Sequence, residues 1–398
     1  MRSFALATAR SILTIGKTVN TLDSAIGHRS TRANEFAQWA LKCKLPELVQ
    51  EQHAKLLPSI VAREFIFGYL LAESYLLQGN PALANTIAQQ SLNQVPCNEL
   101  GAPLTVAPDE AALGKPSIQL LGKGNPSDQD RRSTLAQKLE ERGQFDWAEA
   151  EFRLVLNDDL TNMATLDGMT RLAAMLQIQS KHAEAADVLE PFVTRYNNEP
   201  LFQRQMNEWN RNIGNVLSNF HLYIADDARL QNDNDKAAKN YWQSIELSPE
   251  NVDALIGLYK LPLSDSDKDK CRTKLAKIVF DLRAGIRNGE EELKKSKPND
   301  LAFFSIWIAD KSNTLAWLIA NTEGSKEEAL FLSRKACILS PEHAEYLDTL
   351  AYCYAAMDRY EDAVQQQRRA VDLKPHHPEL VKALKRFEAK LRSAPRSP

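Results

Sequence analysis

Apolar and polar residues follow one another along the chain with the period of amphipathic helices, and these helices come in pairs. The clearest pair lies between Ala344 and His377, a stretch of 34 residues with an amphipathic segment on each side of a short turn at Asp358. Apolar positions spaced three and four residues apart predict helices that each bury one face. The segment is therefore predicted to fold as a helix pair.

The order of residue types within this pair resembles a known repeat. Large apolar, small and aromatic side chains and a final proline occur at Leu347, Leu350, Ala351, Tyr354, Ala363, Gln367, Ala370 and Pro375. The segment resembles a tetratricopeptide repeat, and only Gln367 departs plainly from that family's pattern. The alanines let the two helices approach closely, and the proline ends the second helix. The resemblance implies an all-α fold in which stacked pairs form a right-handed superhelix with a concave surface.

The same order recurs in five further copies upstream. The copies contain Leu315, Ala316, Ile319, Ala329, Ala336 and Pro341; Ile224, Ala225, Ala228, Ala237, Tyr241 and Pro249; Leu172, Ala173, Leu176, Ala185, Leu189 and Phe192; Leu135, Ala136, Leu139, Ala148, Phe152 and Val155; and Leu71, Ala72, Tyr75, Ala84 and Pro96. Six copies in phase make the resemblance to a tetratricopeptide solenoid specific, whereas one copy would be weak. The copy at Leu315 has one extra residue in its turn, and its first helix is predicted to start near Asp300.

The repeats divide the chain into predicted segments. They are a basic N-terminal segment, disordered or used for targeting, at 1–24; an N-terminal helical block with one repeat-like unit at 25–96; a linker or loop at 97–128; a repeat array at 129–260; a long helical insertion or divergent repeat at 261–298; a C-terminal repeat pair with a capping helix at 299–392; and a frayed tail at 393–398. The linker is predicted because Gly and Pro recur too often within it for a helix.

Composition and charge exclude several classes of protein. The chain has 398 residues, of which 43% are hydrophobic and 25% charged, with only 15 Gly and 18 Pro, so it is neither collagen-like nor of low complexity. A formal charge of -3 gives no general attraction to nucleic acid. The five cysteines are scattered without a C-x-x-C pair, which fits neither a disulfide framework nor a zinc cluster.

The first residues leave two localisations open. Arg2, Arg10 and Lys17 precede the first acidic residue, Asp23, as in a segment for organelle targeting. No apolar run reaches the length that crosses a bilayer. We predict a cytoplasmic protein, with organelle targeting or membrane association through the basic segment as the alternative.

Catalytic motifs are missing from the sequence. Neither G-x-S-x-G nor H-E-x-x-H occurs, so we predict a protein that is not an enzyme and uses no cofactor and no metal. A hydrolase or transferase that depends on a cluster of histidine and acid around His182 or His221 is one alternative. An RNA-binding helical-repeat protein is another, although such proteins need a basic concave face.

The resemblance also indicates where a partner would bind. In the family the groove side chains come from fixed positions of the first helix of each repeat, which in the last two copies are Asp310, Asn313, Trp317, Glu345, Asp348 and Tyr352. An amide can bond a peptide backbone, the aromatic rings can stack, and the carboxylates favour a basic or amine-bearing ligand. The family's clamp for the C-terminal carboxylate of chaperones is absent from these positions. The sequence therefore predicts a scaffold that binds an extended peptide or a partner helix.

Overall fold

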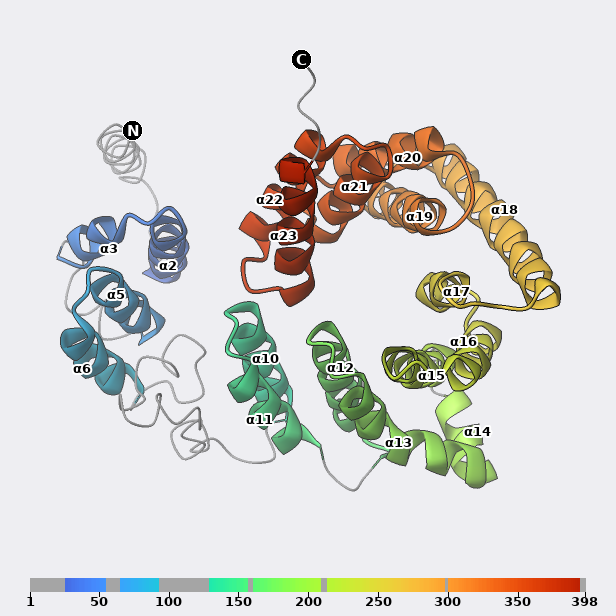
Figure 1. The fold of residues 1–398 in the computed structure, drawn as a ribbon. Helices are drawn as coiled ribbons and strands as arrows, with labels where there is room; N and C mark the ends of the chain where they lie inside the picture. The colour runs from blue at the N-terminus through green and yellow to red at the C-terminus, as the bar shows by residue number, and fades with distance from the viewer. Residues whose placement is uncertain are drawn as a thin grey trace, which may run out of the picture. The chain divides into compact units, whose positions relative to one another are not determined.

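The computed structural model describes residues 26–54, 65–92, 129–156, 160–208, 213–297 and 300–393, and within these ranges it is all-α, without a strand. The helices are α2 (Ile26–Lys42), α3 (Pro46–His53), α5 (Phe65–Leu77), α6 (Pro81–Leu92), α10 (Gln129–Glu141), α11 (Phe145–Val155), α12 (Met163–Ile178), α13 (His182–Asn198), α14 (Pro200–Glu208), α15 (Ile213–Leu230), α16 (Asn234–Leu247), α17 (Val252–Tyr259), α18 (Asp265–Lys295), α19 (Leu301–Asn321), α20 (Lys326–Leu339), α21 (Ala344–Ala356), α22 (Tyr360–Leu373) and α23 (Pro378–Ser393) (Figure 1). The predicted segments 1–24 and 97–128, and the tail beyond Ser393, lie outside the described residues.

Residue contacts divide the chain into two compact units. The first contains α2 to α11, the second contains α12 to α23, and residues 141–143 are grouped with the second. In the first unit α2, α3, α5 and α6 share a core in which Ala37, Ala40 and Tyr69 are fully buried. This division groups residues 129–155 with the first unit, whereas the sequence predicted one array over 129–260. The other domain boundaries stay predictions.

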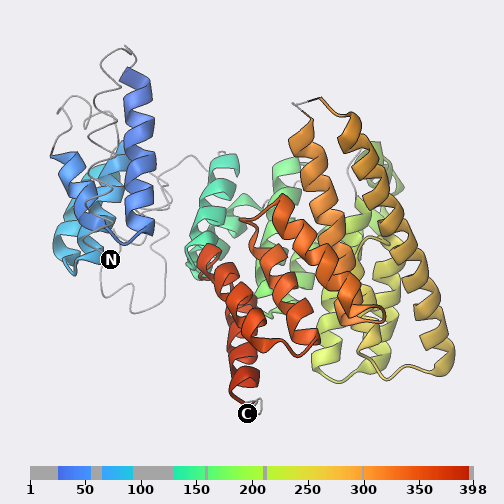
Figure 2. The same ribbon diagram turned by 90° about the horizontal axis from the view of Figure 1, so that it is seen from above.

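The second unit is built from successive helix pairs. Its pairs are α12 with α13, α15 with α16, α17 with α18, α19 with α20 and α21 with α22, and α23 packs on α22. Figure 1 shows α17 and α19 on the inner side of this unit and α18 and α20 on the outer side, and Figure 2 shows the helices side by side. Ala316, Ala351 and Ala363, predicted at the contacts between paired helices, are all fully buried. The predicted all-α, tetratricopeptide-like solenoid is confirmed.

The turns within the pairs show the same phase as the helices. Each first helix of a pair contains a recurring alanine, such as Ala351 in the last copy. The residue seven places after it has a left-handed backbone, with φ between 56° and 78°, at Lys44, Gly79, Gly143, Ser180, Asn232 and Asp358. In the copy with one extra turn residue the positive φ is at Gly324, one place later. Because a left-handed residue ends a helix and redirects the chain, each copy reverses direction at the same position. Lys44 also shows that α2 and α3 form a pair in the same phase.

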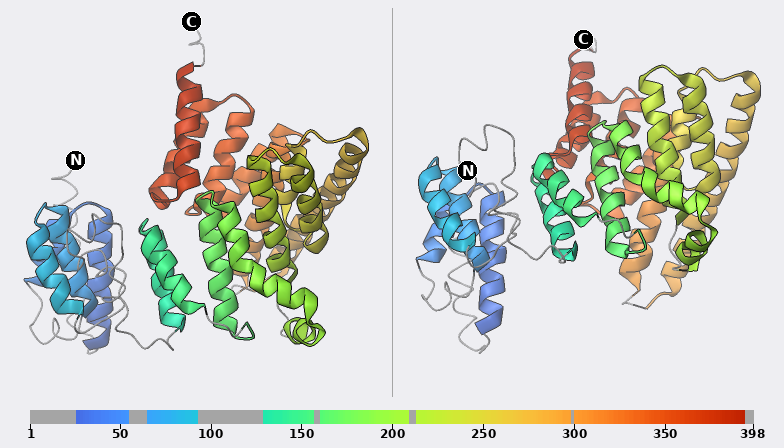
Figure 3. Two further views of the ribbon diagram at one scale, coloured as in Figure 1. Left: turned by 60° about the horizontal axis from the view of Figure 1, so that its bottom comes forward. Right: turned by 90° about the horizontal axis from the view of Figure 1, so that it is seen from below.

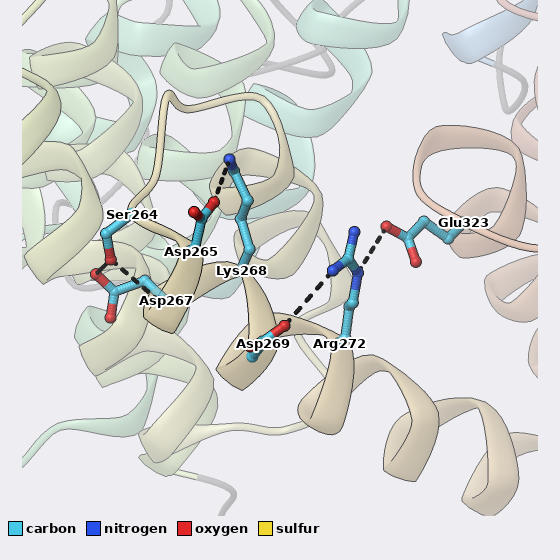
Figure 4. A network of polar contacts seen from close by, with 7 residues as sticks. All are labelled: Ser264, Asp265, Asp267, Lys268, Asp269, Arg272 and Glu323. Carbon is cyan, nitrogen blue, oxygen red and sulfur yellow. Dashed lines mark hydrogen bonds and ion pairs between the residues drawn. The ribbon is translucent and has the colours of Figure 1, made fainter.

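The two longest helices of the second unit are α18, with 31 residues, and α19, with 21. Helix α17, which precedes them, has only 8 residues, and Figure 3 shows α18 as the long gold helix at the edge of this unit. At its start α18 is capped by Ser264, whose Oγ accepts from the backbone N–H of Asp267 at 3.2 Å. Arg272 then binds Glu323 in the turn after α19 at 3.2 Å (Figure 4). These contacts fix the first turns of α18 against the end of α19.

A matched pair of glycines tests the packing of α18 on α19. A Cβ at Gly289 would lie 2.4 Å from the ring of Trp307, whereas a Cβ at Gly285 would lie 3.7 Å from it, an ordinary contact. We expect Gly289→Ala to lower the free energy of unfolding by roughly 1 to 3 kcal/mol through overpacking. Gly285→Ala should raise it by roughly 0.5 to 1 kcal/mol, because alanine is the better helix former. Urea denaturation of both variants checks this, and equal effects would show that Trp307 does not pack as described.

Candidate binding site on the concave face

Three aromatic rings from three different helices of the second unit form a continuous cluster. Trp317 of α19 meets Tyr352 of α21 edge to face, with ring centroids 5.0 Å apart. Tyr352 meets Phe387 of α23 in the same way at 5.2 Å. The guanidinium of Arg386 lies 4.8 Å from the Tyr352 centroid and 5.1 Å from that of Phe387. The cluster therefore joins α19, α21 and α23 through apolar and cation–π contacts.

A carboxylate orients the first ring of this cluster. The indole Nε1 of Trp317 donates to Oδ1 of Asp253, in the first turn of α17, at 2.8 Å. Burial raises the pKa of Asp253, the bond from Trp317 lowers it, and the negative charge of Asp226 raises it again. Asp253 thereby adds a fourth helix to the site.

Asp348 lies beside the same cluster and is held by an unusual residue of the repeat. Nε2 of Gln367 donates to Oδ1 of Asp348 at 2.7 Å and also to the backbone carbonyl of Leu380 at 3.1 Å. Burial raises the pKa of Asp348 to about 6, although the bond from Gln367 and the charge of Arg386 act in the opposite direction. Gln367, which departs from the repeat pattern, therefore links α22 to both α21 and α23.

Charged side chains of both signs face this concavity. Asp253, Lys260 and Glu379 are all exposed to solvent. Yet burial raises the pKa of Glu379, and the negative charges of Asp348 and Asp253 raise it further. Burial lowers the pKa of Lys260, and the positive charge of Arg229 lowers it further. These side chains are therefore reached by water and also influenced by the protein around them. The sequence predicted an acidic groove, and the structure adds Lys260 and Arg386 to it.

The structure separates the six predicted groove residues into two groups. Trp317, Asp348 and Tyr352 belong to the aromatic cluster and its surroundings. Glu345 instead pairs with Lys374, which holds its pKa below the usual value against the effect of burial.

Asp310 and Asn313 lie apart from the rings as well. Asp310 accepts from the hydroxyl of Tyr346 at 3.0 Å. Oδ1 of Asn313 is buried without a partner within the described part of the chain, so it is not presented to a ligand. Sequence reasoning missed Asp253, Phe387 and Arg386 as site residues, and it noted Gln367 only as a departure from the repeat pattern.

The histidines of the enzyme alternative contact amides rather than acids. Nδ1 of His182 lies 2.6 Å from Oε1 of Gln177, and Nδ1 of His221 lies 2.9 Å from Oδ1 of Asn240. Gln177 in turn donates to Asp226 at 2.7 Å. Burial lowers the pKa of His182, so its neutral form is favoured. Across the described ranges no group of three or more His, Cys, Asp or Glu is arranged to hold a metal, and no described helix is long and apolar enough to span a membrane.

Comparisons with known proteins find likeness only among solved structures. No family model and no curated protein matches the sequence. The crystal structure of yeast Tom70 is 14% identical, with 98% of this chain and 96% of that chain covered and a TM-score of 0.31. The TPR2AB domain of yeast Sti1, solved as a pHSP90 complex, is 16% identical, with 68% and 100% covered and a TM-score of 0.26. A thermophilic TPR protein of Thermus thermophilus is 13% identical, with 66% and 99% covered and a TM-score of 0.31.

Proposed function

We propose that this chain is a non-enzymatic interaction scaffold that binds an extended polypeptide segment of another protein on the concave face of its second unit. The observation that carries the proposal is the aromatic cluster of Trp317, Tyr352 and Phe387 surrounded by accessible charges whose ionised forms are disfavoured. Aromatic rings beside charged rims are typical of surfaces that bind peptides.

The charges indicate how a bound segment gains affinity. Burial raises the pKa of Asp253 and Glu379 and lowers the pKa of Lys260, which supports a partial loss of hydration at these side chains. A partner that brings opposite charges compensates this loss in a site from which water is partly excluded. The proposed ligand therefore carries charged residues around an apolar or aromatic one.

Two observations favour a scaffold over the alternatives. His182 and His221 bond Gln177 and Asn240 and not a carboxylate, so neither is set up as the general base of a hydrolase or transferase. The proposed face carries Glu379 close enough to Asp348 and Asp253 for their negative charges to raise its pKa. With Lys260 and Arg386 beside these acids the face is mixed in charge rather than basic, which favours protein over RNA as the partner.

Selection of peptides from a random displayed library on the full chain tests the proposal. Peptides retained by the natural chain should bind at least tenfold more weakly to a Trp317→Ala/Tyr352→Ala variant, because the cluster loses two of its three rings. The matched control is Phe280→Ala/Phe331→Ala, which removes two aromatic side chains that are 65% and 67% exposed. Circular dichroism verifies that both variants stay folded.

The library experiment has clear contradicting outcomes. Equal binding by the natural chain and the Trp317/Tyr352 variant would exclude the aromatic cluster as the site. Loss of binding only when Lys382 and Lys385 are changed, with Arg386 kept, would move the site to the other basic residues of α23. Binding that weakens in higher salt would support the charged part of the proposal, since exposed charge pairs are screened.

A further inference from the structure

A cavity of about 600 Å³ opens between α15, the start of α17, α18 and α19. Its position follows from helix lengths. α17 has 8 residues, whereas α15 has 18 and α19 has 21, so the middle helix covers little of α18 behind it. Ile278, Leu282 and Gly285 of α18 consequently line the cavity. Cavities of this size accommodate a small molecule or a few residues of a bound peptide.

One wall of the cavity presents amide donors in fixed positions. Ser248 Oγ donates to Oδ1 of Asn215 at 2.7 Å, and Asn251 Nδ2 donates to Oδ1 of Asn219 at 3.2 Å and to Ser218 Oγ at 3.0 Å. These bonds occupy the carbonyl oxygens of Asn215 and Asn219. Their Nδ2 groups make no hydrogen bond within the part of the chain that the structure describes. Two N–H donors of the lining therefore stay available to a ligand and suit the carbonyl oxygens of a peptide backbone.

The opposite wall carries negative charge that the lining residues do not balance. Lys311 Nζ pairs with Glu250 at 3.2 Å, so these two charges offset each other. Within the described residues the carboxylate of Asp310 accepts only from the neutral hydroxyl of Tyr346, at 3.0 Å. Asp281 is exposed and has no hydrogen bond or ion pair with any described residue. The lining thus keeps two carboxylates available for a cation.

We infer that this cavity binds an arginine side chain of the polypeptide segment, together with the backbone carbonyls next to it. The inference rests on the proposed function and specifies the chemistry of the partner. A guanidinium is planar and weakly hydrated, so it packs against Ile278 and Leu282 while it donates to Asp281 and Asp310. A lysine ammonium is a compact and strongly hydrated point charge, and it gains less from the apolar wall.

The distance to the aromatic cluster sets a spacing in the partner. Asp310 and Trp317 are seven residues apart on α19, which corresponds to about 10 Å along the helix axis. An extended chain advances about 3.3 Å per residue. The arginine is therefore three residues away from the side chain that contacts Trp317 and Tyr352.

Calorimetric titration of the full chain with the probe peptide acetyl-Ala-Arg-Ala-Ala-Phe-Ala-amide tests the inference. We expect Asp281→Asn to weaken binding about tenfold, because one charge-assisted hydrogen bond is lost. The control is Asp269→Asn, which removes the same charge from α18 at an exposed position outside the cavity, where Asp269 lies 3.5 Å from Arg272. Replacing the arginine of the probe by citrulline, which keeps its shape and removes its charge, should weaken binding at least as much as Asp281→Asn does, because both carboxylates lose their cation.

The outcomes separate this inference from the proposed function. Binding that Asp281→Asn and citrulline leave unchanged, but that Trp317→Ala/Tyr352→Ala weakens, would overturn the arginine site and leave the concave-face proposal intact. A natural chain that does not bind the probe would also overturn the arginine site, while the library selection still decides the proposed function. Probes with the arginine one or six residues from the phenylalanine should bind more weakly, and equal binding would overturn the inferred spacing.

Discussion

Replacing Arg132 by Met is expected to lower the free energy of unfolding of the first unit by about 3 to 5 kcal/mol. NH1 of Arg132 on α10 pairs with Oε2 of Glu151 on α11 at 2.8 Å, and the side chains are only 5% and 0% exposed. Burial raises the pKa of Glu151, and the charge of Arg132 opposes this effect. Removing the guanidinium leaves a carboxylate enclosed by protein, so the variant must either bury a charge or take up a proton. Urea denaturation at neutral pH measures the loss.

Two further variants show whether burial is the cause. A double variant, Arg132→Met/Glu151→Leu, should recover most of the lost stability, because an apolar pair of similar size replaces a buried ion pair without large cost. Arg153→Met breaks an exposed pair on the same helix, where Arg153 and Glu149 are 2.7 Å apart and the arginine is 51% exposed. It should cost no more than about 1 kcal/mol. Equal losses in Arg132→Met and Arg153→Met would contradict a buried pair.

The sequence predicts the helix pairs of this fold because their contacts are local. The two helices of a pair approach closely only where a side chain is small. Alanines therefore recur at these contacts, as at Ala316 and Ala351, which are fully buried. The early start of α19 was also predicted, near Asp300, and the helix begins at Leu301. The left-handed turn residue was harder to recognise, since Lys44, Ser180 and Asp358 occupy it as well as glycine. Residue type alone therefore marks this position in some copies only.

The candidate site depends on contacts that no local pattern encodes. Asp253 and Trp317 are hydrogen-bonded although they are 64 residues apart in the chain. Their meeting depends on how far the solenoid curves between α17 and α19, which is set by the unusual lengths of α17 and α18. Gln367 was visible in the sequence as a departure from the repeat. Its bonds to Asp348 and Leu380 require the position of α23, which the repeat pattern does not define.

Asp348→Asn should make the protein more stable at pH 7 than the natural chain, by at most about 3 kcal/mol. The pKa of Asp348 rises from 3.8 to about 6 in the folded protein, chiefly because of burial. Between these values the folded state holds a proton that the unfolded state has lost, so the natural chain loses stability as the pH rises from about 4 to about 7. Asparagine carries no charge at any pH and can still accept from Gln367. The advantage of the variant should therefore be small near pH 4 and largest above pH 6.

Comparing the two proteins at each pH separates Asp348 from the other titrating groups, because these are shared and cancel in the difference. A difference that stays flat from pH 4 to pH 7 would show that Asp348 ionises normally in the folded chain. Gln367→Leu gives an independent check. The bond from Gln367 lowers the pKa of Asp348, so its loss should raise that pKa further and move the titration midpoint, followed by NMR of the carboxyl carbon, to higher pH. A midpoint that moves to lower pH would mean that Gln367 does not stabilise the carboxylate, and that the link between α21, α22 and α23 is made in another way.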